Sequence, residues 1–135
     1  MIFPKLLLNP ENVNFFVAEL SPLVCNEYLR RKSNSEKTLL PSVCIAQAAL
    51  ESGWNINATT LFGIKGDGME LSTTEFINGG YVNIIDSFKK YPSITAAVQG
   101  YYDLMQWNNY DDATSQSDVE GQVDGLTNDI GYKYA

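Results

Sequence analysis

One carboxylate stands out by its surroundings. Glu51 is the single acid in the stretch 41–54, whose other residues are mostly apolar or small. Pro41 suits the first turn of a helix, and Gly53 suits the left-handed residue that ends one. The stretch therefore predicts a helix that is apolar nearly all round and hence buried. A carboxylate in that setting loses hydration, and its pKa rises towards the range of a general acid. A solvated glutamate at a helix end is the alternative that these residues leave open.

The composition excludes several other chemistries. A chain of 135 residues is long enough for one domain with its own core. It contains no histidine, which removes Ser-His-Asp and Cys-His catalysis and histidine-ligated metals. The net charge of −7 argues against nucleic acid, whose phosphates need a basic surface. Cys25 and Cys44 are too few for a disulfide framework, and we expect buried free thiols.

Helical periodicity covers most of the chain. Apolar stripes predict helices over 11–20, 21–32, 41–52, 93–105 and 119–130. Ser21 and Pro22 are typical of a cap and a first turn, so they predict a break between the first two helices. Arg30, Arg31 and Lys32 end the second of these helices, where cations suit the helix dipole. The dipole alone accounts for this basic triplet.

The strongest strand signal lies in the middle of the chain. Segments 73–77 and 81–85 flank Asn78-Gly79-Gly80, and this pattern predicts a β hairpin. Segment 86–92 predicts a connection, and the polar and acidic segment 108–118 predicts a loop.

The order of elements predicts an α+β domain. Helices precede and follow the hairpin, so a mainly helical body should carry a small β lobe. We expect a single domain over 1–135, with an N-terminal arm over 1–10 and the hairpin lobe over 70–86. Tyr102 and Trp107 fall off the apolar stripe of their helix and could face a groove or a second core, and we expect both in the core.

Two motifs carry a resemblance to a known family. Ala46-Gln-Ala-Ala-Leu-Glu-Ser-Gly-Trp54 is followed at close spacing by Leu61-Phe-Gly-Ile-Lys-Gly66. In this order they resemble the glucosaminidase domain of glycoside hydrolase family 73, which includes bacterial autolysins, the flagellar rod peptidoglycan hydrolase and phage wall-degrading proteins. The resemblance runs from about Phe15 to the C-terminus. It implies a lysozyme-like fold in which the helical body and the hairpin lobe form a cleft.

The resemblance also implies which residues act. Glu51 would be the general acid. Thr73-Thr-Glu-Phe76 matches a pattern whose glutamate, here Glu75, is often proposed as the second carboxylate. Gly131-Tyr132 matches a pattern whose tyrosine lies beside the acid, so Tyr132 joins the catalytic set, with Tyr134 as its alternative. The implied substrate contacts are Gln47, Trp54, Phe62, Gly63, Lys65 and Tyr134.

The implied reaction is hydrolysis of the β-1,4 bond between N-acetylglucosamine and N-acetylmuramic acid in peptidoglycan strands, with no metal or organic cofactor. Either Glu75 or the sugar's own 2-acetamido group would support the oxocarbenium-like centre. Two alternatives stay open. One is a muramidase or a lytic transglycosylase, which cut the alternate bond, and the other is a non-catalytic glycan-binding or structural module of the same fold.

The resemblance implies action outside the cell or in the cell wall. No apolar run approaches the ~20 residues of a membrane span, so we expect no membrane insertion. We also expect no signal peptide at the N-terminus, because the apolar run between Pro4 and Pro10 is short. An enzyme of the cell wall would then leave the cell by phage lysis, a phage tail or another route. Because the chain is acidic, wall targeting would come from a further module or an assembly.

Overall fold

The longest element is helix α1 (Pro10–Ser33), in a computed structural model that describes residues 9–129 except the side chains of Leu71, Thr73, Glu75 and Asp129. Asn9 caps this helix, since its side chain accepts a hydrogen bond of 2.9 Å from the backbone N–H of Glu11. One face of α1 is buried along its length, and its residues recur at helical spacing. They are Phe16, Leu20, Val24, Glu27 and Arg31.

The predicted break at Ser21-Pro22 is wrong, because Pro22 lies inside α1. Proline has no N–H, so the carbonyl of Ala18 loses its usual helical donor. Ala18 and Pro22 are both exposed, and water can hydrate that carbonyl. The buried stripe meanwhile continues from Leu20 to Val24. Packing against the core therefore holds the two halves in one helix.

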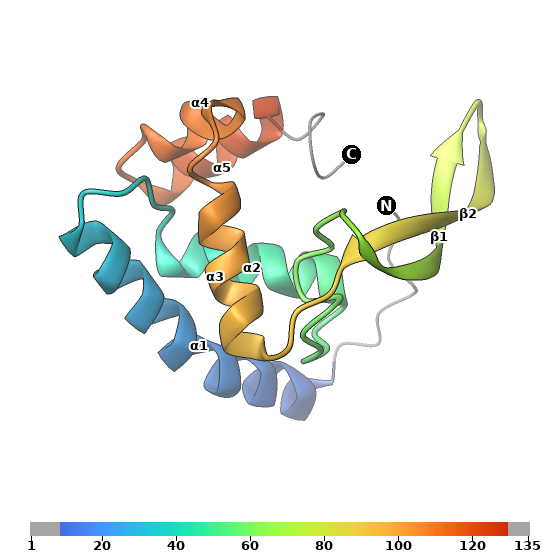
Figure 1. Ribbon diagram of the computed structural model, residues 1–135, viewed down its shortest axis with the longest axis horizontal. Coiled ribbons are helices and arrows are strands. Elements are labelled where there is room, and N and C mark those ends of the chain that lie inside the picture. The colour runs from blue at the N-terminus through green and yellow to red at the C-terminus, as the bar shows by residue number, and fades with distance from the viewer. Residues whose placement is uncertain (1–8, 130–135) are drawn as a thin grey trace.

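Helices α2 (Pro41–Ser52) and α3 (Ile94–Leu104) complete the centre of the body (Figure 1). Pro41 and Ser93 begin these helices as predicted, and the Ser93 side chain accepts a bond of 3.0 Å from the N–H of Ala96. The three helices bury one apolar cluster together with the loop that follows α2. Its fully buried large side chains include Phe16, Leu20, Leu39, Leu61, Phe62, Tyr101, Tyr102, Met105 and Tyr110.

The segment predicted as an acidic loop is partly helical. A 3-10 turn, η1 (Asn108–Tyr110), leads into the short helix α4 (Asp111–Thr114), and α5 (Val119–Asp129) follows. The loop prediction failed because Tyr110 and Ala113 are both buried, and this pins the turns to the core. Gly125 of α5 lies so close to α4 that an added Cβ would collide with the backbone of Ala113.

The hairpin is longer than predicted. Strands β1 (Gly68–Ile77) and β2 (Gly80–Lys89) pair antiparallel in a two-stranded sheet that extends from the body (Figure 1). Asn78 and Gly79 form the two-residue connection, with φ of 50° and 81°. These positive angles are those of a type I′ turn, which matches the twist of paired strands. The strand continues through the segment predicted as a connection because Phe88 is buried against the body.

Two aromatic residues had been assigned to the core. Tyr102 is fully buried, and its hydroxyl donates a bond of 2.9 Å to the carbonyl of Leu39, so that prediction is confirmed. Trp107 is 50% exposed, so the same prediction for Trp107 is wrong. Cys25 and Cys44 are free thiols as expected, with Cys44 buried and Cys25 half-buried.

Arg31 corrects the explanation of the basic triplet. Its guanidinium is only 4% exposed and joins α1 to α3. It bonds the Glu27 carboxylate at 3.1 Å and the Asp103 carboxylate at 2.7 Å, and it donates to the carbonyl of Gln99 at 3.0 Å. Arg30, by contrast, is half-exposed and pairs with Glu27 alone. The helix dipole therefore does not explain Arg31, whose buried ion pairs and hydrogen bond connect α1 to α3.

We predict that Arg31→Ala destabilises the protein by about 3–5 kcal/mol, because it removes one partner from a buried ionic network. Arg30→Ala is the matched control and should destabilise the protein far less, since that side chain is half-exposed and its ion pair is open to water. Urea unfolding followed by circular dichroism measures both. Equal losses for the two variants would contradict the assignment of Arg31 as the residue that connects α1 to α3.

Candidate active site

Glu51 lies in the last turn of α2, where the chain reverses sharply. Gly53 adopts the predicted left-handed conformation (φ 65°, ψ 39°), and its N–H donates to the carbonyl of Ala49 at 2.9 Å. Trp54 is also left-handed, at φ 63°, which is unusual for a side chain of this size. Its ring meets Phe16 edge-on, with the centroids 5.6 Å apart. This contact with α1 holds the turn that follows the acid.

The half-buried position of Glu51 changes its acidity. Loss of hydration raises the pKa of the carboxyl from 4.5 to about 7, and the positive charge of Lys65 acts in the opposite direction. Near neutral pH the group is therefore present in both protonated and ionised forms. A carboxyl in this state can give up a proton and take it back in successive steps.

Gln47 lies one turn before Glu51 on the same side of α2. Its side-chain oxygen accepts a hydrogen bond from the hydroxyl of Tyr101 on α3. Tyr101 is fully buried and stacks on Phe62, with the ring centroids 4.4 Å apart. The bond uses the amide oxygen of Gln47, which leaves the amide nitrogen as the donor beside the acid.

The loop after α2 separates buried from exposed residues. Leu61, Phe62, Gly63 and Ile64 are buried, and Gly63 has a φ of 60°, which favours glycine. Phe62 is only 2% exposed, so it supports the site through Tyr101 and offers almost no ring face to a ligand. Lys65 follows and is exposed.

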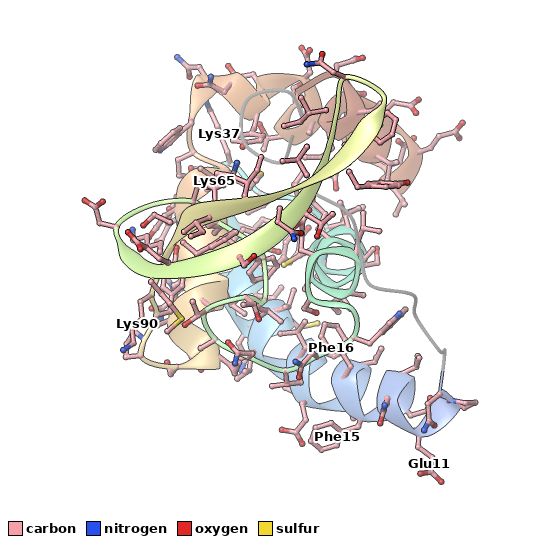
Figure 2. All side chains as sticks on the ribbon, turned by 90° about the vertical axis from the view of Figure 1, so that its right-hand side faces the viewer. Glu11, Phe15, Phe16, Lys37, Lys65 and Lys90 are labelled. Atoms are coloured by element: carbon pink, nitrogen blue, oxygen red, sulfur yellow. The ribbon has the colours of Figure 1, made fainter. Side chains whose placement is uncertain are left out.

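Lys65 connects the body to the hairpin. Its ammonium pairs with the carboxylate of Asp86 at 2.8 Å, and its backbone bridges Phe88 of β2. On either side of Lys65, backbone hydrogen bonds join the loop to β2. The N–H of Lys89 donates to the carbonyl of Ile64 at 2.9 Å, and the N–H of Gly66 donates to the carbonyl of Ser87 at 3.0 Å. In Figure 2 the Lys65 side chain rises beyond the hairpin ribbon towards the upper helices.

Two of these partners were absent from the predicted site. Tyr101 belongs to the apolar stripe of the helix predicted over 93–105. A buried tyrosine hydroxyl needs a hydrogen-bond partner, and the stripe does not show which residue provides it. Asp86 begins the segment predicted as a connection, and it directly follows the predicted strand 81–85. Aspartate is rare in strands, so its place in β2 suggests a specific contact. Both signals are visible in the sequence, but neither one identifies its partner.

The remaining predicted residues are placed only in part. Glu75 of β1 pairs with Val82 of β2. The side chain of Glu75 lies outside the described structure, and so do Tyr132 and Tyr134. Asp86 pairs with Leu71, four residues from position 75, which is about 13 Å along the strand. Gln47 shares a side of α2 with Glu51, and the charge of Lys65 acts on the Glu51 carboxyl. Trp54 packs on Phe16, and Phe62 packs on Tyr101.

Among the described residues, no three histidine, cysteine, aspartate or glutamate side chains gather as a set of metal ligands. Within residues 9–129, no helix combines the length and apolar character needed to cross a membrane.

The chain is similar in sequence and fold to several known proteins. The family described as mannosyl-glycoprotein endo-beta-N-acetylglucosaminidase matches residues 28–135. The peptidoglycan hydrolase FlgJ of Escherichia coli K12 is 30% identical over 140 residues, which cover 91% of this chain and 42% of FlgJ. A probable N-acetylmuramidase of Lactococcus lactis subsp. cremoris MG1363 is 34% identical over 82 residues, 53% of this chain and 19% of that protein. The chain thus spans less than half of these relatives.

A solved structure shares the fold. A peptidoglycan hydrolase mutant from Sphingomonas sp. A1 superposes with a TM-score of 0.69 at 26% identity, covering 87% of this chain and 82% of that one.

The fold is lysozyme-like, a helical body with a small β-hairpin lobe and a half-buried glutamate at the end of a core helix, and this confirms the predicted class. The chain belongs to the glucosaminidase family, glycoside hydrolase family 73, as its two motifs indicated.

The raised pKa of Glu51 predicts a pH-dependent stability. In the unfolded chain the carboxyl titrates near 4.5, and in the folded protein near 7. Below about pH 4.5 the carboxyl is protonated in both states, so its burial does not lower the free energy of unfolding. As the pH rises through 7, that free energy falls, because the ionised form is less stable in the folded protein.

We predict that Glu51→Gln is more stable than the wild type by about 1–3 kcal/mol near pH 8, and that the gain disappears towards acid pH. Urea unfolding at several pH values measures this difference. Glu19→Gln makes the same change at an exposed position of α1 and should give a flat difference. A flat difference for Glu51→Gln as well would contradict the shifted acid.

Proposed function

We propose that this chain hydrolyses the β-1,4 bond between N-acetylglucosamine and N-acetylmuramic acid in peptidoglycan, with Glu51 as the general acid. The observation that carries the proposal is the half-buried Glu51 carboxyl with a pKa of about 7, at the end of the family's motif helix. Membership of the glucosaminidase family supports the choice of bond.

In the proposed reaction, the protonated Glu51 donates its proton to the glycosidic oxygen as the C1–O bond breaks. The positive charge that develops at C1 then needs a partner on the opposite face of the sugar. Water adds to C1 and loses a proton, and Glu51 is protonated again. Because Gln47 lies beside the acid and keeps an amide N–H for donation, we assign it a substrate hydrogen bond.

Two groups are candidates for support of the charge at C1. Glu75 is the family-based candidate, and it belongs to the hairpin. The 2-acetamido oxygen of the substrate is the other, and it would attack C1 itself to form a cyclic intermediate. Tyr132 and Tyr134 stay proposals for a hydroxyl that orients water or substrate. Trp54, Phe62 and Gly63 enter the proposal as the packed floor beneath the groove.

A muramidase is the second candidate, because the matching Lactococcus relative is named a probable N-acetylmuramidase. That activity would use the same acid on the alternate bond. The products separate the two candidates. Mass spectrometry of digested glycan strands should find N-acetylglucosamine at the new reducing ends under the main proposal. Reducing N-acetylmuramic acid would favour the muramidase, and an anhydro end would indicate a transglycosylase.

The proposed place of action is the bacterial cell wall. FlgJ and the Sphingomonas protein are both named as peptidoglycan hydrolases, which supports glycan strands as the partner. Because the sequence is acidic, with a net charge of −7, we propose that another module or assembly supplies attachment to the wall.

We predict that Glu51→Gln lowers the rate of wall clearing by at least about 100-fold, because an amide cannot donate the proton. Turbidity loss of purified bacterial walls measures the rate, and circular dichroism verifies the fold of each variant. Glu19→Gln is the control and should clear walls like the wild type. If the wild type binds walls but clears none from several species at any pH, the non-catalytic module replaces the hydrolase.

We also predict that Lys65→Met extends activity to higher pH. The charge of Lys65 holds the pKa of Glu51 down, so its removal should raise that pKa and keep the acid protonated for longer. The alkaline limb of the rate profile, normalised to its maximum, should therefore move towards higher pH. Lys37→Met removes a lysine that pairs with Asp111 instead, and its profile should keep its position. A shift towards lower pH in Lys65→Met would contradict this electrostatic link.

A further inference from the structure

A pocket of about 490 Å³ lies where the hairpin base meets α3. Its wall includes the loop that carries Lys65, together with α3 and the turn that follows it. Its lining includes the charged and aromatic residues Lys65, Asp67, Lys89, Tyr91, Asp103 and Trp107. Glu51 is not among the residues that line it, so the pocket is separate from the proposed cleavage point.

Trp107 gives this pocket an aromatic surface. Its side chain is 50% exposed, although tryptophan is usually well buried. The residue follows α3, and its backbone N–H donates to the carbonyl of Leu104 at 3.1 Å. An indole held on a short turn at the rim of a pocket offers a rigid apolar face. The C–H faces of sugar rings pack on such surfaces.

The opposite wall is built around Tyr91. Its ring covers Gly100 of α3 so closely that a Cβ at this glycine would collide with the tyrosine hydroxyl. Lys89 places its ammonium 5.6 Å from the centre of the same ring. The tyrosine is thus held by two neighbours before any ligand arrives, which lowers the entropy lost on binding.

The polar rim of the pocket carries both signs of charge. Lys65 and Lys89 supply cations, while Asp67 and Asp103 supply carboxylates. Asp103 is held by Arg31 at 2.7 Å, yet it remains 72% exposed. A balanced rim of donors and acceptors suits the hydroxyl and acetamido groups of a neutral sugar, whereas a charged peptide would favour a rim of one sign.

The pocket shares Lys65 with the predicted site. This residue lines the pocket, and its charge lowers the pKa of the Glu51 carboxyl. The loop around it is bonded to β2 on both sides, so the loop is held against the hairpin. A glycan strand bound at Glu51 would follow this loop into the pocket.

We propose that this pocket is a carbohydrate subsite, in which Trp107 stacks on an N-acetylhexosamine unit of the strand away from the bond that is cut. The subsite rests on the proposed function for its ligand. It would favour longer strands, because a single sugar reaches either the acid or the pocket.

Binding measured without cleavage tests the subsite. In the Glu51→Gln background, calorimetric titration with the tetramer of N-acetylglucosamine gives the Kd of each variant. Trp107→Ala should raise that Kd about tenfold, the loss expected for an aromatic anchor. Trp107→Phe keeps a ring and should recover most of the affinity. Phe15→Ala removes an equally exposed ring from α1, far from Lys65 in Figure 2, and should change nothing.

A second measurement needs no change at Trp107. Titration of the Glu51→Gln protein with the same tetramer should shift backbone NMR signals of 64–67 and 103–107, and the monosaccharide should shift these signals far less. An unchanged Kd in Trp107→Ala overturns the subsite, and so does a parent protein that does not bind the tetramer. If Trp107→Ala loses binding while the wild type cleaves no walls, the subsite stands and the proposed hydrolysis fails.

Discussion

The exclusion of water from the end of α2 is the constraint on which the rest of the structure depends. The pKa of Glu51 is raised chiefly because its ionised form loses hydration there. That requires neighbours close to the end of the helix, where the last buried residues, Ala48 and Ala49, are small. Short side chains let α1 and the loop after α2 approach the helix closely. The apolar sequence of α2 thus serves both the core and the acidity of a single group.

Within residues 9–129, the hairpin meets the body around the 64–66 loop. Backbone bonds join this loop to β2, and the Lys65–Asp86 pair and the buried Phe88 add side-chain contacts. The same lysine lowers the pKa of the acid and lines the pocket. Geometry, charge and substrate path are therefore coupled at one position, so a change there acts on all three together.

Local signals in the sequence predicted well wherever a short motif determines a conformation. The Gly53 end of α2, the Asn78-Gly79 turn and the Ser93 cap are of this kind. The failures share a different cause, since each depends on residues far apart in the chain. Pro22 is kept inside α1 by packing, and Arg31 is buried by partners on α3. Within the site, the motif identified Glu51, but no spacing rule predicts that Asp86 reaches Lys65.

The tie between Arg31 and Asp103 joins residues that are 72 positions apart, whereas the hairpin closes through a two-residue turn. Contacts between neighbours form early in folding, and distant ones form late. We therefore expect the hairpin to form before α3 docks on α1. Glu51 keeps the acidity of a solvated carboxylate until α1 and the loop after α2 have packed around the end of α2. An unfinished chain on the ribosome would carry the complete motif before it has the acid, because that acidity depends on contacts that the motif alone does not supply.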